Sequence, residues 1–218
     1  MVRKRTLVSK KTIVTRYSQR PAGSLVDIGA GTGAFAALMK ACGWEVTALE
    51  PDPSARTLAE KNHHIRLHEP SVLFEIAAGS IDVITMWHVL EHVHTLKDYL
   101  LQFKKIVKTG GILLIAVPNY TSMDAEKYGR FWAAYDVPRH LYHFSPRAME
   151  TLLNLYGFEI KTLLPMWYDS FYVSLLSEKY KTGKQKLGKG VWSGIQSNWN
   201  ALQQKNRCSS LVYVVKVP

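Results

Sequence analysis

The sequence predicts a doubly wound α/β protein built on a mostly parallel sheet, and three observations support this. Apolar runs of strand length alternate with helical patterns five times over, which implies right-handed crossovers in one sheet. The run from Ile112 to Val117 is apolar throughout, as expected of a central strand covered on both faces. Gly29, Gly31 and Gly33 separate the first strand from the first helix, where they let backbone approach a ligand.

The expected elements follow from apolar periodicity and from glycine and proline stops. The predicted strands are Leu25–Ile28, Trp44–Glu50, Ile65–Leu67, Ile81–Met86, Ile112–Val117, Phe158–Leu164 and Ser210–Val217. The predicted helices are Thr32–Ala41, Ala55–Lys61, Pro70–Ala78, Leu96–Lys108 and Arg147–Tyr156, with a further helix within residues 1–20 laid over the mouth of the cofactor site.

Two segments do not fit the strand and helix alternation. Residues 119–144 are rich in aromatic and polar side chains without a clear period, and connections of that length are usually lids or binding loops. Residues 167–207 form a basic and mostly helical insertion. The 218 residues suit a single domain, with the basic segment 1–20 at its N-terminus.

The formal net charge of +11 is unevenly distributed. Residues 1–20 hold seven Lys or Arg and no acid, and residues 178–207 hold seven against one acid. The centre, residues 21–177, has 13 basic and 16 acidic residues and is slightly acidic. The basic segments are therefore either solvated flanks or contacts for phosphate, an anionic membrane surface or an acidic substrate.

The two cysteines, Cys42 and Cys208, are too few for a disulfide framework and lie outside any metal-type pair, so we expect a cytoplasmic location. No stretch approaches the roughly 18 apolar residues of a membrane span. The basic start of the chain is followed by interrupting Lys and Arg residues rather than by the apolar core of a signal peptide.

The loop Gly29-Ala30-Gly31-Thr32-Gly33-Ala34 has two interpretations. As G-x-G-x-x-A it is a degenerate dinucleotide fingerprint, with Glu50 as the ribose acid about 20 residues further on. As D-x-G-x-G-x-G, starting at Asp27, it resembles motif I of the class I S-adenosylmethionine-dependent methyltransferases. The acid inside the strand, the glycine spacing and the β-rich end of the chain favour the methyltransferase interpretation.

The resemblance covers residues 22–165 and 210–217. Through the stretch from Ile81 to Val93 it is strongest to small-molecule methyltransferases of the ubiquinone/menaquinone-biosynthesis-like group. It implies a Rossmann-like sheet of seven strands, in which the last strand is antiparallel and inserted between the fifth and the sixth. A lid insertion over the carboxyl end of the sheet is part of this expectation.

The resemblance also implies roles for individual residues. Asp27 lies near the amino end of the cofactor, Glu50 accepts hydrogen bonds from both ribose hydroxyls, and Trp87 and His88 border the methionine part and the transferred methyl group. Glu69 is the nearest candidate for an acid at the adenine, and it is equally well a surface residue. The expected cofactor-binding residues are Asp27, Gly29, Ala30, Gly31, Gly33, Glu50, Trp87 and His88.

Four polar side chains, His88, Glu91, His92 and His94, crowd the turn after the strand 81–86, where ligands bind in open parallel sheets. The ubiquinone O-methyltransferases that this turn resembles have Glu-x-x-Glu-His here, linked to a divalent metal, which would fall on His88, Glu91 and His92. Alternatively one histidine is the general base for the acceptor, or the turn is structural. Our prediction includes no metal, and His88 and His92 are candidate catalytic residues.

The 119–144 segment holds a second group of functional side chains. His140 and His143 are candidate bases, Arg139 is a candidate for holding a phosphate or carboxylate, and Trp132 and Tyr135 are candidates for an apolar wall. The alternative is that Arg139 pairs with a neighbouring acid and the aromatic residues close a satellite core.

Taken together, these features predict an S-adenosylmethionine-dependent methyltransferase that acts on an oxygen or carbon nucleophile of a small molecule. The hypothesis allows an anionic or lipid-linked acceptor. It also allows peripheral contact with a membrane. The stretch Pro118-Asn119-Tyr120 lacks the Asp/Asn-Pro-Pro-aromatic motif of many amino-group methylating enzymes, and Trp87-His88 stands in that motif's place after strand four. The alternatives are an NAD(P)-dependent oxidoreductase and a nucleic-acid-binding or RNA-methylating protein that uses the basic segments.

Overall fold

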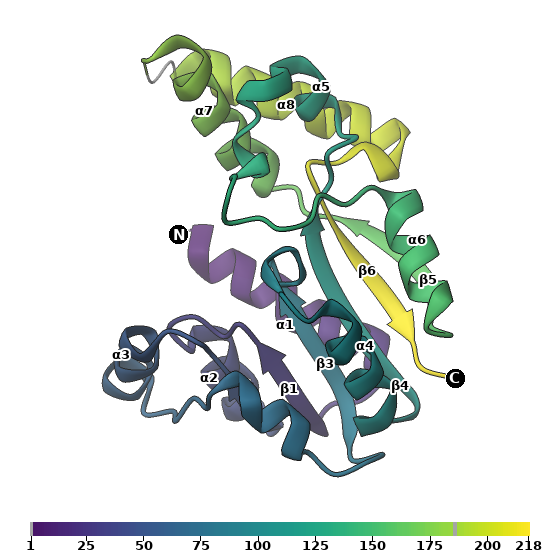
Figure 1. Ribbon diagram of the computed structural model, residues 1–218. Helices are drawn as coiled ribbons and strands as arrows, with labels where there is room; N and C mark the ends of the chain where they lie inside the picture. The colour runs from purple at the N-terminus through teal and green to yellow at the C-terminus, as the bar shows by residue number, and fades with distance from the viewer. Residues whose placement is uncertain (1, 185–186) are drawn as a thin grey trace.

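The computed structural model describes residues 2–184 and 187–218 and contains a six-stranded sheet with helices on both faces (Figure 1). The strands are β1 (Ser24–Ile28), β2 (Glu45–Leu49), β3 (Ile81–Trp87), β4 (Val107–Pro118), β5 (Glu159–Pro165) and β6 (Ser210–Lys216). Their order is β2-β1-β3-β4-β6-β5. The first four strands are parallel to one another, and β6 is antiparallel to both β4 and β5. The antiparallel last strand in an inner position is therefore confirmed.

The seventh strand expected at Ile65–Leu67 is not confirmed, because among the described residues this stretch makes only the single bridge from Leu49 to His68. His64 ends the preceding helix in a left-handed conformation with φ of +53°. Pro70, which has no N–H, opens the next helical turn. Of the described residues between them, only His68 exchanges backbone hydrogen bonds with the β2 side, at Ala48 and Glu50, although the side chains of Ile65 and Leu67 are buried.

Two layers of helices cover the sheet. On one face, α1 (Val2–Ser18) and α2 (Ala34–Ala41) pack through side chains such as Val14 and Phe35. On the other face, α4 (Leu96–Ile106) and α6 (Pro146–Leu155) pack through side chains such as Phe103 and Met149. Each fully buried side chain of this size contributes roughly 1.5–3 kcal/mol. The remaining helix of this part, α3 (Pro53–His63), lies beside α2 and β2.

The expected N-terminal helix is present as α1, and it reaches the carboxyl end of β3. Its Lys10 side chain places Nζ 4.7 Å from the ring centroid of Trp87 and 5.9 Å from that of Phe35. These contacts join the basic N-terminal segment to α2, which follows the glycine loop, and to the last residue of β3.

Segments 119–144 and 167–207 together build a helical cap beyond the carboxyl ends of the parallel strands (Figure 1). The cap consists of α5 (Met123–Tyr128), η3 (Gly129–Phe131), η4 (Ala133–Tyr135), α7 (Asp169–Thr182), α8 (Leu187–Gln203) and η5 (Lys205–Arg207). Two short helices lie outside it, η1 (Pro70–Glu75) and η2 (Leu90–His92). None of the helices in the described part of the chain has the length and apolar content for crossing a membrane.

The buried Asp124 holds the cap together. Its carboxylate accepts hydrogen bonds from Trp132 Nε1 at 2.8 Å, Ser197 Oγ at 3.0 Å and Ser209 Oγ at 2.7 Å. Trp132 is 2% exposed and packs in a small core beneath α5 and α7. It therefore belongs to the satellite core that was the alternative to an apolar substrate wall.

Candidate functional site

The three glycines of the loop after β1 have positive φ angles, +71° at Gly29, +55° at Gly31 and +75° at Gly33, which only glycine adopts without strain. A Cβ on Gly29 would lie 2.3 Å from Val89 Cγ2, and one on Gly33 would lie 2.8 Å from Ala59 Cβ. A Cβ on Gly31 would meet no protein atom within 4 Å. Gly29 and Gly33 are thus required by packing, whereas Gly31 faces open space.

Glu50 stands directly after β2 and closes the loop. Its Oε2 accepts the N–H of Gly31 at 2.7 Å, and its Oε1 accepts the N–H of Asp52 at 3.1 Å. The side chain is only 8% exposed. An ionised carboxylate has about four acceptor positions, so this one can still accept hydrogen bonds from two adjacent hydroxyl groups of a ligand.

Asp27 is a buried acid beneath the same loop. Its Oδ1 accepts a hydrogen bond from Thr85 Oγ1 at 2.7 Å. Burial, partly offset by this bond and by the nearby Lys10, raises the pKa of Asp27 to about 6. Burial also lowers the pKa of Lys10. The protein thus keeps a carboxyl group where its ionised form is disfavoured.

His88 lies between two carboxylates just after β3, in a backbone conformation with φ of +60°. Its Nε2 donates to Asp169 Oδ2 at 2.7 Å, and its Nδ1 is 3.5 Å from Glu91 Oε1. Burial opposes the charge on the ring, but the two carboxylates outweigh it and raise the pKa of His88 to about 10. With both ring nitrogens directed at carboxylates, His88 acts as a partly buried cation that connects β3 to α7.

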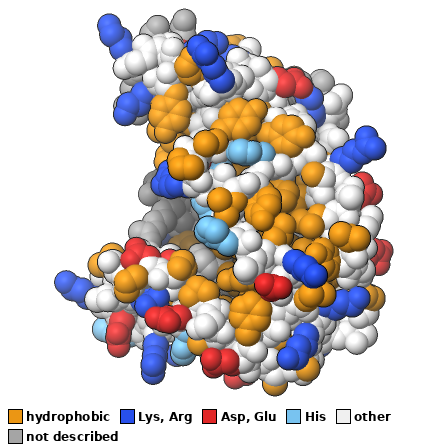
Figure 2. Space-filling model, in the orientation of Figure 1, with side chains coloured by type: hydrophobic (Ala, Val, Ile, Leu, Met, Phe, Trp, Pro, Cys, Tyr) orange, Lys and Arg blue, Asp and Glu red, His pale blue; other side chains and the backbone are white. Residues whose placement is uncertain are grey.

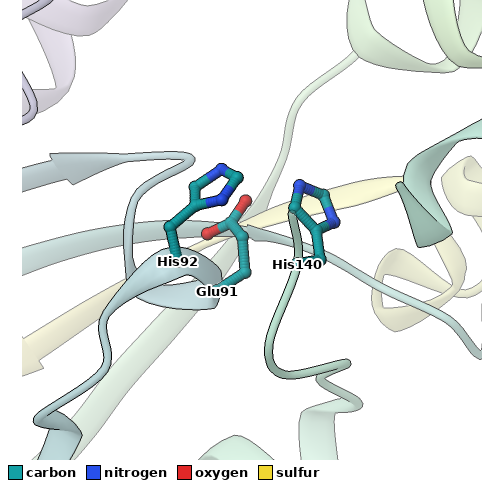
Figure 3. A group of neighbouring side chains, drawn as sticks. All are labelled: Glu91, His92 and His140. Carbon is teal, nitrogen blue, oxygen red and sulfur yellow. The ribbon is translucent and has the colours of Figure 1, made fainter. Parts of the chain in front are cut away.

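Glu91, His92 and His140 form a second group, with side chains that point toward one another (Figure 3). One potential ligand atom from each residue lies within 4.8 Å of the other two. The set differs from the His88, Glu91 and His92 triad that the resemblance implied, because Asp169 binds His88 and the 119–144 segment brings His140 to Glu91 instead.

A pocket of about 260 Å³ opens beside these groups, between the carboxyl ends of the strands and the helical cap. Figure 2 shows this face of the molecule hollowed, with histidine side chains at the wall of the hollow. Its apolar lining includes Val173 and Leu176 of α7. Its polar lining includes His88, Glu91, Asp136, Arg139, His140 and Asp169.

The candidate residues of the 119–144 segment differ in whether they line the pocket. His140 lines the pocket. His143 does not; it is exposed, and its Nε2 contacts the backbone oxygen of Tyr135 at 2.9 Å. Arg139 pairs with Asp136 at 2.7 Å, as the alternative interpretation held.

A separate apolar groove of about 370 Å³ lies beside Gly29, at the start of the glycine loop. Its lining includes Ile28, Gly29, Leu49, Pro51, Val89 and Tyr99. Glu69, the candidate for the adenine, does not line this groove; its side chain is 68% exposed and pairs with Arg56.

Two residues of the site were not predicted from the sequence. Asp169 is the only acid between Glu159 and Glu178, and an isolated acid in an apolar stretch is the signal that could have found it. Lys10 is one of seven basic residues in the first twenty, and nothing in the pattern distinguishes it from its solvated neighbours.

The fold and the site together define a class. The sheet order, the glycine loop facing open space and the acid after β2 describe a Rossmann-like protein that binds a nucleotide-type cofactor. Residues 3–163 match the family model described as "Methyltransferase domain". The chain therefore belongs to this methyltransferase family, and the class that the glycine loop predicted is confirmed.

Curated relatives and solved structures agree with this membership. The chain is 27% identical over 169 residues to a ubiquinone biosynthesis O-methyltransferase of Rickettsia canadensis, covering 72% of this chain and 71% of that protein. It is 25% identical over 197 residues to a malonyl-[acyl-carrier protein] O-methyltransferase of Serratia marcescens, covering 88% and 76%.

Two solved structures share the fold. A SAM-dependent methyltransferase from Archaeoglobus fulgidus superposes with a TM-score of 0.63 at 15% identity, over 98% of this chain and 94% of that one. The geranyl diphosphate C-methyltransferase of Streptomyces coelicolor A3(2) superposes with a TM-score of 0.65 at 13% identity, over 99% and 82%.

Replacing Gly31 with alanine is expected to weaken binding of S-adenosylmethionine at least tenfold, because the new Cβ enters the open space of the cradle. Gly79→Ala is the matched control, since Gly79 also has a positive φ, +59°, and no atom within 4 Å of the added Cβ. Both variants should lose about 1–2 kcal/mol of stability from the left-handed backbone. Calorimetric titration and urea unfolding measure the two effects, and equal affinity for both variants would contradict the assignment.

Asp27→Asn is expected to be more stable than the wild type at high pH. The pKa of the folded state is raised, so this group's contribution to stability is greatest below its unfolded pKa and is lost as pH rises through about 6. Linkage gives a difference in the free energy of unfolding between the variant and the wild type of about 3 kcal/mol at pH 8, and about half of that at pH 5. Urea unfolding at both pH values measures it. If the wild type were more stable than Asp27→Asn at pH 8, ionisation of the buried Asp27 carboxyl would not destabilise the fold, and the prediction would be wrong.

Proposed function

We propose that this protein transfers the methyl group of S-adenosylmethionine to a hydroxyl oxygen, or to an activated carbon, of a small molecule with an apolar part. The observation that carries the proposal is the arrangement of Gly31 and Glu50: a glycine facing open space, with its amide bound to a buried carboxylate that still has acceptor capacity. S-adenosylmethionine is the methyl donor that this family membership and this cradle support.

The residues present suit that donor in three places. The Glu50 carboxylate can accept from both ribose hydroxyls. The apolar groove beside Gly29, with Pro51 and Val89 in its walls, has room for a flat purine ring. Asp27, beneath the loop with Lys10 and Thr85 as neighbours, supplies negative charge for the amino end of the donor.

When bound, S-adenosylmethionine supplies a methyl group on a positively charged sulfur. The protein has to orient the acceptor in line with that group and exclude water. The pocket at His88 and Asp169 lies on the cap side of β3, and we assign the acceptor to it. In this proposal the 119–144 segment and α7 act as the lid over the acceptor.

A hydroxyl acceptor also has to lose its proton. At the pocket, the Glu91 carboxylate and the Nε2 atom of His140 have lone pairs for it, whereas both nitrogens of His88 face carboxylates. We therefore assign His88 to positioning and charge, and proton acceptance to the Glu91 and His140 side of the pocket.

The pocket favours a neutral acceptor over an anionic one. Arg139 is already paired with Asp136, so an anionic acceptor would have to compete with that carboxylate. Apart from Asp169, the α7 side chains that line the pocket are apolar or aromatic, which supports an acceptor with a hydrophobic part.

Two further features concern the kind of acceptor and the location of the protein. Trp192, Ile195 and Trp199 are exposed at three- and four-residue spacings along α8, and such an apolar face supports a lipid-linked acceptor. Cys42 and Cys208 are free thiols, which supports the reducing cytoplasm that we propose as the location. Family membership does not favour the oxidoreductase alternative, and the relatives described above give no support to an RNA substrate.

Donor binding tests this function. Glu50→Gln is expected to weaken S-adenosylmethionine binding at least tenfold, because an amide accepts with only one of its two end atoms. Glu69→Gln is the control, since Glu69 is exposed and lies on the Arg56 side of the loop, and it should leave affinity within twofold. Calorimetric titration of both variants with S-adenosylmethionine and with NADH measures this. Preferential binding of NADH, or an unchanged Kd in Glu50→Gln, would refute the proposed donor site.

A further inference from the structure

Helix α8 buries its small side chains and exposes its large apolar ones, which is the reverse of an ordinary surface helix. Trp192, Ile195 and Trp199 recur at three- and four-residue spacings and are 59%, 43% and 67% exposed. On the opposite face, Ser193 and Ser197 are each 1% exposed. Spacings of three and four residues put side chains on one side of a helix, so α8 turns an apolar stripe outward.

The close contact between α8 and α7 explains this orientation. A Cβ on Gly190 would lie 2.7 Å from Leu175 Cδ2, and one on Gly194 would lie 2.7 Å from Phe171 Cδ1. Each would also lie 3.0 Å from the Cα atom of the same α7 residue. Glycines four residues apart let two helix backbones approach closely, an arrangement that is frequent among helices surrounded by lipid. The two helices together form the α7–α8 hairpin, at the end of the molecule opposite β1 (Figure 1).

The surface charge of the α7–α8 hairpin is positive. Residues 179–207 hold seven Lys or Arg and no acid. The side chains of Lys179, Lys181 and Lys184 are exposed. Glu178, the acid that precedes them, is buried. The hairpin therefore suits a negatively charged partner.

We propose that the α7–α8 hairpin docks on an anionic lipid bilayer, with α8 lying along its surface. Tryptophan is enriched at the boundary between headgroups and acyl chains, and a helix with an apolar face and basic neighbours binds in the plane of that boundary. Trp192 and Lys181 line one pocket beside α8, so the apolar stripe and the positive charges adjoin. A second copy of the chain suits this face less well, because like charges would oppose each other.

Docking would also bring lipid close to the acceptor pocket. Tyr172, Leu176 and Tyr180 recur every four residues along α7 and line that pocket. Lys181, the residue after Tyr180, lines the pocket at Trp192. The end of α7 therefore connects the acceptor pocket to the docking face. This consequence, unlike the docking itself, rests on the proposed function, and it means that the apolar part of the acceptor enters from the bilayer.

Vesicle binding by the whole chain tests the docking without methyl donor or acceptor, so its outcome is separate from that of the proposed function. The protein is mixed with vesicles of phosphatidylcholine alone, or of equal parts phosphatidylcholine and phosphatidylglycerol, and the bound fraction is measured by co-sedimentation. Binding to the anionic vesicles is expected to be the tighter and to fall with added salt, which screens the charges. Tryptophan emission should shift to shorter wavelength on binding.

A double variant tests the apolar stripe. Trp192→Ser combined with Trp199→Ser should weaken binding to the anionic vesicles at least tenfold and remove most of the emission shift. Leu155→Ser is the control, because Leu155 is 77% exposed on α6, outside the cap, and it should leave the Kd within twofold. Circular dichroism checks that each variant folds.

A triple variant tests the charges and carries the test if the tryptophan variant does not fold. Lys179→Gln, Lys181→Gln and Lys184→Gln together should weaken binding about 100-fold, because each lysine near an anionic surface contributes about a factor of five. The matched control lowers the net charge equally by changing three exposed lysines outside the hairpin to glutamine: Lys40, Lys61 and Lys97. It should leave the Kd within threefold.

Four results would overturn the proposal. Two are binding no tighter to anionic than to neutral vesicles, and an unchanged Kd in the tryptophan variant, which would indicate a general attraction to polyanions. The third is an equal loss of affinity in the two lysine variants. The fourth is a dimer, seen by light scattering, that the tryptophan variant converts into monomers, because a second copy of the chain would then cover this face.

Discussion

The ion pair between His88 and Asp169 is the constraint on which the shape of the site depends. Its 2.7 Å contact joins the turn after β3 to the first turn of α7, across 81 positions of the chain. The same turn holds the 119–144 segment, because the carbonyl oxygen of Glu91 accepts from the N–H groups of Leu141 and Tyr142 at 2.8 and 3.3 Å. The pocket exists because three remote stretches are held at the carboxyl end of one strand.

Buried acids at the two ends of the sheet differ in how fully their carboxylates are paired. At the amino end of β3, Asp82 is buried, yet its bonds to Lys108 and Ser24 outweigh burial and lower its pKa to about 2. At the carboxyl end, burial raises the pKa of Asp27 to about 6, and Glu91 has no hydrogen-bond partner among the described residues. A carboxylate that is fully paired stabilises the fold. A buried one that is not fully paired costs stability and remains available to a ligand, as at many functional sites.

The sequence predicted the donor side of the site better than the acceptor side. The loop at Gly31 and the acid at Glu50 depend on local spacing around one strand-to-helix turn, which a sequence displays directly. The contact of Asp169 with His88 and that of His140 with Glu91 depend on how the helical cap folds back over the sheet, and no local period encodes that. The expected strand at Ile65–Leu67 had the right apolar pattern and its side chains are buried, but the backbone pairs with β2 only at His68, which an apolar pattern does not reveal.

A crystal structure of the protein with S-adenosylhomocysteine tests the central claim most directly, namely that donor and acceptor meet at the turn after β3. The account predicts the ribose on Glu50, the purine in the groove beside Gly29, and the sulfur directed at the pocket that His88 and Asp169 line. A sulfur directed away from that pocket, or a ribose bound away from Glu50, would contradict it.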